Sequence, residues 1–306
     1  MTVRLGTRGS ALAMAQSRSV AEALTAATGE SVELVEIVTD GDRSSKPVVQ
    51  LGVGVFVSAL REALHAKEID VAVHSYKDLP TAPADGLVIA AVPQRADPRD
   101  ALVSRDGRGL AELAPGTRVG TGAPRRISQL LALGQGLECV PVRGNVDTRL
   151  RRVAEADLDA VVVAAAGLER LGRVGEATEL LDPMLMLPAP AQGALAVECR
   201  AADTGLVELF GSLDDDLTRA RITAERALLA ALEAGCSAPV AALADVSETE
   251  DGAWEIYLRG AVLSLDGGNV VKLSGTGTLT DAVGVGTRLA AELLAEGADH
   301  ILGVPE

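Results

Sequence analysis

The sequence contains few aromatic residues, few cysteines and few histidines. Aromatic side chains make up 2% of its 306 residues, so any core must be built from Val, Leu, Ile and Ala, and the apolar fraction of 48% is ample for that. Three cysteines and three histidines are scattered along the chain without a CxxC pair. This spacing argues against a zinc site and against a disulfide framework, so we expect no bound metal.

Positive charge and long apolar runs are scarce as well. The formal net charge is −15, which argues against non-specific binding of nucleic acid but leaves room for local basic clefts. The opening MTVRLGTRGS lacks the apolar run of a signal peptide, and no stretch of about 18 apolar residues follows. We therefore expect a cytoplasmic protein that binds neither nucleic acid nor a membrane.

Strand and helix patterns alternate through the first 90 residues. Strands are expected at 3–7, 32–38 and 69–75, and helices from Ser10 to about Thr28, ended by Gly29, and at 56–66. Such an order favours a mainly parallel sheet covered by helices. The pattern then begins again: 117–133 is strand, Gly-rich turn and helix like the opening, and 157–168 is similar to 68–75. We expect two lobes of related design.

Pro-rich segments at 93–100 and 187–193 mark the breaks. A strand at 194–200 is expected to return to the first lobe, which gives two crossovers and a hinged cleft. From about residue 216 a helical stretch (217–234) leads to a hairpin with a DGGN turn (254–277) and to a helix at about 280–296. The predicted fold is α/β, with two similar periplasmic-binding-protein-like lobes around a cleft and a small α+β third domain. The predicted domains are 1–93 plus 194–212, 99–188 and 216–306.

Polar clusters follow several of the predicted strands, where ligands lie in open α/β sheets. The loop GTRGS (6–10) opens a helix and presents N–H groups to an anion, although plain helix capping explains it equally well. The loop GTGAPRR (120–126) also opens a helix. Between Arg118 and Arg152 there are seven arginines, no lysine and two acids, a local balance of +5. Arginine without lysine is typical of carboxylate or phosphate recognition.

Some residues in these clusters can be explained by a purely structural role instead of a functional one. Arg151 and Arg152 suit a solvated helix face, whereas Arg143 and Arg149, on either side of the turn Gly144-Asn145, favour binding. Asp78 in HSYKDLP is either a turn cap or a catalytic carboxylate, and we expect its neighbour His74 to be a packed strand residue rather than a ligand.

The three cysteines differ in their surroundings. Cys139 and Cys199 lie in apolar strand patterns and are expected in the core. Cys236 follows Gly235, a typical residue after the end of a helix, and so lies on the loop CSAP. A loop-borne thiol in a cytoplasmic protein favours a covalent role, and because histidines to serve as its base are so few, attachment of a group is a better interpretation than nucleophilic catalysis.

Taken together and in this order, these motifs resemble the porphobilinogen deaminase (hydroxymethylbilane synthase) family. The resemblance rests on VRLGTRGS (3–10), HSYKDLP (74–80), DPRDALVS (97–104), VRGNVDTR (142–149), LPAPAQGALAVECR (187–200) and TAERALLAALEAGCSAP (223–239), and fades only in about the last 60 residues. It implies a transferase of porphyrin and heme biosynthesis that joins four porphobilinogen units head to tail, releases ammonia each time and frees hydroxymethylbilane by hydrolysis.

The resemblance also implies roles for individual residues. Cys236 matches the family's cysteine that carries a dipyrromethane cofactor through a thioether, and Asp78 matches its catalytic carboxylate, which would stabilise a cationic azafulvene. Every pyrrole carries acetate and propionate arms, which would explain an arginine-rich region in an acidic protein. The positions matching cofactor- and substrate-binding residues are Thr7, Arg8, Ser10, Ser75, Lys77, Thr121, Arg125, Arg126, Arg143, Arg149, Arg170 and Gln192. A monomer is implied, with its product passed to uroporphyrinogen-III synthase.

Two departures from the family pattern concern binding rather than catalysis. Relatives often have two serines before the paired arginines, where this chain has Gly122 and Ala123. The loop before residue 56 often carries lysines, but none occurs around Gln50 and Val53, and only Lys46 lies nearby.

Two other classes of protein share parts of this pattern. A two-lobed anion-binding protein would have the same architecture, but it gives no reason for a thiol on a third domain. An inactive paralogue with a scaffold role would keep the motifs without the activity.

Overall fold

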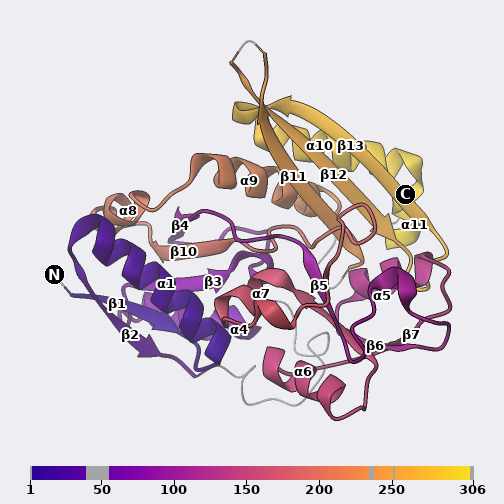
Figure 1. Cartoon of the computed structure of the whole chain (residues 1–306). Coiled ribbons are helices and arrows are strands. Elements are labelled where there is room, and N and C mark those ends of the chain that lie inside the picture. Colours follow the sequence, from indigo (N-terminus) through magenta and orange to yellow (C-terminus); the bar gives the residue numbers. More distant parts are fainter. Residues whose placement is uncertain (1, 39–54, 234–237, 251, 304–306) are drawn as a thin grey trace. The chain divides into compact units, whose positions relative to one another are not determined.

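The computed structural model describes residues 2–38, 55–233, 238–250 and 252–303 (Figure 1). The contacts within the chain divide it into two compact units. The first unit comprises Met1–Ala96 and Ala194–Arg219, and the second comprises Asp97–Gly193 and Ala220–Glu306. Strand β10, just after residue 193, pairs with strands of the first unit, which confirms the predicted return of the chain. The separation of 99–188 from 216–306 as two domains stays a prediction.

The first unit is built on a five-stranded sheet in the order β2-β1-β3-β10-β4. β1 is parallel to β2 and β3, whereas β10 is antiparallel to β3 and β4, so the sheet predicted to be mainly parallel is mixed. The strands are β1 (Thr2–Thr7), β2 (Ser31–Glu36), β3 (Val71–Ser75), β4 (Leu87–Ala91) and β10 (Leu195–Arg200), and the helices are α1 (Ala11–Thr28), α4 (Val55–His65), α8 (Thr204–Gly211) and the short η1 (Tyr76–Asp78).

Helix α1 has the ends that its sequence predicts. The hydroxyl of Ser10 accepts a hydrogen bond from the N–H of Ala13 at 3.3 Å, which satisfies one of the unpaired donors of the first turn. At the other end Gly29 has a φ of 76°, a left-handed conformation that glycine adopts without strain, and its N–H bonds to the carbonyl of Thr25. Leu24 is fully buried in the core of the first sheet.

The second unit contains a sheet with the same topology as the first. Its order is β7-β6-β8-β5-β9, with β6 parallel to β7 and β8, and β5 antiparallel to β8 and β9. The predicted likeness of the two lobes is therefore confirmed at the level of strand order and direction. The strands are β5 (Asp100–Ser104), β6 (Arg118–Gly120), β7 (Glu138–Val140), β8 (Ala160–Ala164) and β9 (Glu179–Leu180), and the helices are α5 (Pro124–Ala132), α6 (Val146–Ala154), α7 (Ala165–Arg170) and the short η2 (Leu110–Glu112) and η3 (Val174–Glu176).

A third, antiparallel sheet completes the second unit in the order β11-β12-β13. The predicted hairpin is confirmed as β12 (Trp254–Leu263) and β13 (Val270–Thr278), whereas β11 (Val240–Glu248) was not predicted. The remaining elements are α9 (Asp216–Ala231), which begins in the first unit, η4 (Leu279–Asp281), α10 (Ala282–Leu293), the π-helical η5 (Leu294–Ala298) and α11 (Asp299–Leu302).

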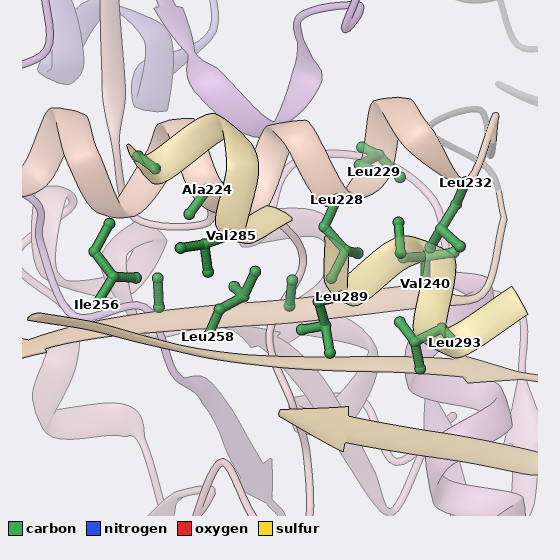
Figure 2. Close-up of a cluster of buried hydrophobic side chains, with 14 of the residues drawn as sticks. Ala224, Leu228, Leu229, Leu232, Val240, Ile256, Leu258, Val285, Leu289 and Leu293 are labelled. Atoms are coloured by element: carbon green, nitrogen blue, oxygen red, sulfur yellow. The ribbon is translucent and has the colours of Figure 1, made fainter. Parts of the chain in front are cut away.

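Helices α9 and α10 pack their apolar side chains together over this sheet, as Figure 2 shows for Leu228, Leu289 and Leu258. A glycine allows the two helices to approach closely, because a Cβ on Gly286 would lie 2.3 Å from the carbonyl oxygen of Ala224. Of the helices in the described part of the chain, none has the length and apolarity needed to cross a membrane.

Candidate active site

In the first unit, the predicted site residues lie at one edge of the sheet. β1 and β3 are parallel, so Thr7 and Ser75 end their strands at the same edge. Thr7 is fully buried and its hydroxyl donates to the carbonyl of Arg8 at 3.3 Å, and Arg8 is half-buried. Ser10 caps α1, which is the ordinary alternative for this loop, and a role in binding stays a prediction.

Ser75 and Asp78 differ in whether their side chains have hydrogen-bond partners within the protein. The amide nitrogen of Gln16 on α1 donates to the Ser75 hydroxyl at 2.9 Å, so this side chain is fixed in place. Lys77 is half-buried and Asp78 is exposed at the end of η1. Among the residues that the structure describes, the Asp78 carboxylate has no hydrogen-bond or ion-pair partner, so it does not cap the turn. An exposed carboxylate without a structural partner is available to a ligand.

His74 is packed inside the sheet, as predicted, and belongs to a buried charged group. Its Nε2 lies 3.2 Å from Oε2 of Glu198 on β10, and Arg61 of α4 donates to Glu198 at 2.8 Å. Burial alone would raise the pKa of the Glu198 carboxyl, but the hydrogen bonds from His74 and Arg61 outweigh it and hold the pKa below 4.5. This group ties the helix to the strand that leads to Asp78.

The second unit holds the paired arginines in a fully buried ion cluster. Arg125 and Arg126 lie in the first turn of α5, and both pair with Asp100, the first residue of β5, which is 0% exposed. Nη1 of Arg125 donates to Oδ2 of Asp100 at 2.6 Å, and Nη2 of Arg126 donates to Oδ1 at 2.7 Å. Two guanidinium groups thus share one carboxylate, and the cluster carries a surplus of one positive charge.

Burial and charge in this cluster shift the pKa values of Asp100 and Arg126. Burial by itself would raise the pKa of the Asp100 carboxyl, but the charges of Arg125 and Arg126 outweigh it and hold that pKa well below 3.8. Burial lowers the pKa of the Arg126 guanidinium to about 10, and repulsion from Arg125 and Arg149 acts in the same direction. Arg149 therefore adds to the positive potential that Arg126 experiences.

Gln192 and Thr121 are buried beside the cluster. The Gln192 amide oxygen accepts from Nη2 of Arg125 at 2.9 Å, and its nitrogen donates to Oδ1 of Asp100 and to the carbonyl of Pro98, both at 2.8 Å. Thr121 directly follows β6 and is 0% exposed. Gln192 thus links the segment before β5 to Arg125 and to the ion cluster.

The other predicted arginines are less enclosed. Arg170 on α7 is half-buried and donates to the carbonyl of Gly193 at 2.6 Å, and burial lowers the pKa of its guanidinium to about 10. Arg149 donates to the carbonyl of Gly144 at 2.9 Å, whereas Arg143 is exposed. The turn between them continues into α6, where Asn145 accepts from the N–H of Thr148 at 2.9 Å as the capping residue.

The structure therefore joins Arg125, Arg126 and Gln192 through their shared partner Asp100. Arg149 is close enough to affect the pKa of Arg126. Sequence reasoning did not single out Asp100 or Glu198, although the segment DPRD (97–100) carried a signal as part of the family resemblance. Cys236 lies outside the described residues, as do Lys46, Gln50 and Val53. Cys199 is buried, which raises the pKa of its thiol to about 11, and burial also raises the pKa of Cys139.

This set of side chains is suited to an anion rather than to a metal ion. Across the described ranges, no group of three or more His, Cys, Asp or Glu residues is placed to hold a metal. Surplus positive charge lies at the carboxyl ends of β6 and β8, where open α/β sheets bind ligands. Arginine forks match carboxylates in shape and charge.

Two family models match the chain. The model described as porphobilinogen deaminase, dipyromethane cofactor binding domain, matches residues 3–208, and the model of the porphobilinogen deaminase C-terminal domain matches residues 219–295. Among solved structures, a periplasmic substrate-binding protein of an ABC transporter from Coxiella burnetii is similar over 69% of this chain and 91% of that chain, with 14% identity and a TM-score of 0.44.

Curated relatives match the chain over nearly its whole length. The porphobilinogen deaminase of Mycolicibacterium paratuberculosis is 59% identical over 304 residues, which cover 98% of this chain and 96% of the relative. That of Mycobacterium tuberculosis H37Rv is 58% identical, with 98% of each chain covered. With the two family models, this identity shows that the chain belongs to the porphobilinogen deaminase family.

Proposed function

We propose that this chain condenses four porphobilinogen molecules head to tail into hydroxymethylbilane, on a covalently attached dipyrromethane primer. Membership of the family establishes an enzyme that assembles a tetrapyrrole from porphobilinogen, and a transferase is the class that this reaction implies. The structural observation that carries the proposal is the buried cluster of Arg125, Arg126 and Asp100, whose surplus positive charge suits a carboxylate-rich ligand.

Each condensation exchanges one bond for another. The aminomethyl C–N bond of porphobilinogen breaks and ammonia leaves with the bonding electrons. The resulting carbocation forms a C–C bond with the free α-carbon of the preceding pyrrole, which then loses its proton. After four such steps, water adds to release the tetrapyrrole, so four porphobilinogen and one water give hydroxymethylbilane and four ammonia.

Asp78 is the proposed catalytic carboxylate. Loss of ammonia from porphobilinogen leaves a cation, and a fixed negative charge beside it lowers the energy of the transition state that leads there. The Asp78 carboxylate is exposed and, in the part of the chain that the structure describes, has no partner that would compete for it. The same carboxylate can accept pyrrole N–H hydrogen bonds and help to move protons.

The polar residues after the strands are the proposed carboxylate-binding set. In the second unit, Arg126, Arg143, Arg149 and Arg170 would hold acetate and propionate arms, with Arg125, Thr121 and Gln192 in support. In the first unit, Arg8 and Lys77 would do the same with Thr7, Ser10 and Ser75. Because every pyrrole adds two negative arms, the charge of the bound chain grows with each condensation, and a set of cations is needed to hold it.

The dipyrromethane group fits the residues present. Its carboxylate arms match the buried surplus charge of the Arg125–Arg126–Asp100 cluster, and the family model covering residues 3–208 is named for binding it. We propose that Cys236, whose placement is outside the described residues, forms the thioether. When bound, the group supplies the free pyrrole α-carbon to which the first porphobilinogen is joined.

We further propose that the enzyme acts as a cytoplasmic monomer and passes its product to uroporphyrinogen-III synthase. A two-lobed binding protein without catalysis is the competing function, and the chain's likeness to a periplasmic substrate-binding protein is one of fold. A binding protein would need neither Cys236 nor Asp78, so the two functions differ in what happens to substrate and to the thiol.

Intact-mass measurement of the purified protein tests the proposal. We expect one dipyrromethane of added mass, mapped to the peptide containing Cys236, a colour with Ehrlich's reagent, and ammonia released from porphobilinogen. Cys236→Ser should lose both the added mass and the activity, whereas Cys139→Ser and Cys199→Ser, the matched controls, should keep both and lose about 1 kcal/mol of stability each. Active enzyme with an unmodified Cys236 would refute the attachment site, and bound but unreacted porphobilinogen would favour the binding protein.

A further inference from the structure

The two arginines of the buried ion cluster differ in how many of their N–H groups have acceptors. Both terminal nitrogens of Arg125 are fully used: Nη1 donates to Asp100 and to the carbonyl of Leu187, and Nη2 donates to Asp100 and to Gln192. Only its Nε–H has no acceptor among the described residues. Arg125 is therefore held as a structural support, with little capacity left for a ligand.

Arg126 keeps more of its hydrogen-bonding capacity. Its Nε and Nη2 both donate to Oδ1 of Asp100, at 3.1 Å and 2.7 Å, and its Nη1 donates to the carbonyl of Val162 at 3.0 Å. Within the described residues, one N–H on each terminal nitrogen lacks an acceptor. The two open donors lie on a guanidinium whose other edge is fixed by Asp100, so its orientation is set before any ligand arrives.

The charge balance points in the same direction. One carboxylate serves two guanidinium groups at the start of a helix, where the helix dipole is also positive, and Arg149 adds repulsion. A buried charge without a partner is costly, so the cluster is stabilised when one further anion joins it. Asp100 cancels the first positive charge and leaves one for a ligand.

We propose that Asp100, clasped by Gln192, is a positioning residue that fixes Arg125 as a support and orients Arg126 to hold a single carboxylate of the pyrrole chain. This inference rests on the proposed function. Asp100 touches the arginines and not the reacting atoms, so it acts through Arg126. A specific carboxylate contact would be formed equally before and during the chemical step, and its loss should affect KM rather than kcat.

The variant Asp100→Asn distinguishes positioning from simple charge cancellation, because the two roles predict opposite changes in the KM for porphobilinogen. If Asp100 only weakened the attraction for anions, its loss would increase the positive charge and lower the KM for porphobilinogen. If it positions Arg126, we expect KM to rise by about tenfold, equivalent to about 1.4 kcal/mol, with kcat per cofactor-loaded enzyme changed by less than about twofold. Intact mass should also show a smaller fraction of chains carrying the dipyrromethane. A lower or unchanged KM would overturn the proposal.

A second variant covers the case in which Asp100→Asn fails to fold. Gln192→Met keeps all three charges and the side-chain length. It removes the amide that accepts from Arg125 and donates to Asp100 and to the carbonyls of Pro98 and Arg99. We expect a KM rise of about threefold, which corresponds to about 0.6 kcal/mol, and an unchanged KM in this variant would also overturn the proposal.

Asp159→Asn is the matched control. Asp159 pairs with Arg105 at 2.8 Å and accepts from the N–H of Arg118, at the opposite end of β8 from the residue that pairs with Asp100. Its variant should keep the wild-type KM, and an equal rise there would show a general loss of structure instead of positioning. Wild-type protein that forms no tetrapyrrole would refute the proposed function, whereas active wild-type protein with unaltered variants would refute this inference alone.

Discussion

Two small residues precede the paired arginines of α5, and the structure shows what each position tolerates. A Cβ on Gly122 would lie 2.5 Å from the carbonyl oxygen of Val142, a backbone atom that cannot easily move. Ala123 is the N-cap residue of α5, with the extended φ and ψ of −97° and 118° that suit a capping serine, but it has no side-chain oxygen to cap with. We expect Ala123→Ser to be accommodated and Gly122→Ser to be resisted.

The magnitudes follow from these surroundings. A serine cap is worth about 1 kcal/mol over alanine, which raises the apparent Tm of a chain this long by about 2 °C. Its oxygen can accept from the helix while its O–H donates to a carboxylate. A hydrogen bond to a charged group is worth about 1.5–3 kcal/mol when shielded and less at an open site, so the KM for porphobilinogen should fall by roughly 3- to 10-fold. Turnover should change little.

Thermal unfolding and steady-state kinetics on both single variants check this reasoning. Gly122→Ser requires the backbone to shift, at a cost of about 1–3 kcal/mol, and should lower the apparent Tm. An Ala123→Ser variant with a raised Tm and an unchanged KM would mean that this loop does not contact substrate carboxylates, and that the arginines alone hold them. A Gly122→Ser variant as stable as wild type would show that the close approach to Val142 is wrong.

Three further outcomes are expected. Asp78→Ala should reduce turnover by a factor on the order of 10²–10³ in steady-state assays, with partial activity in Asp78→Glu, and near-normal turnover in the alanine variant would exclude the catalytic role. In a Cys236→Ser background, Cys139 and Cys199 should react slowly with a disulfide reagent at mildly alkaline pH, because burial raises both pKa values, that of Cys199 to about 11; rapid labelling of native protein would contradict this. The pKa of Asp100 lies below 3.8 in the folded protein, so its stabilising contribution is present above that value and is lost as the pH falls further. Urea unfolding should therefore show the stability gap between wild type and Asp100→Asn narrowing in strong acid, and a constant gap would refute the assignment.

Local chemistry predicted those parts of the fold that depend on neighbouring residues. Ser10 and Gly29 mark both ends of α1 because a hydroxyl and a left-handed glycine act within one turn of the helix. The strand order of the second sheet repeats the first, as the recurring pattern indicated. β11 was missed because Val240–Ala244 is buried on both faces and shows no alternation of polar and apolar residues.

Charge counts along the sequence do not predict which charged residues pair with one another in the folded site. Counting acids between Arg118 and Arg152 gives a strongly positive segment, but Asp100, which neutralises half of the buried pair, lies 25 residues before Arg125 and joins it only because β5 runs antiparallel beside β8. Counting charges within one stretch of the sequence therefore overestimated how many of these arginines are available to a ligand. Asp78 shows the reverse error, because a single aspartate in a turn resembles a cap in the sequence, yet in the described structure its carboxylate caps nothing. For both residues, function depends on which partners the fold has already supplied.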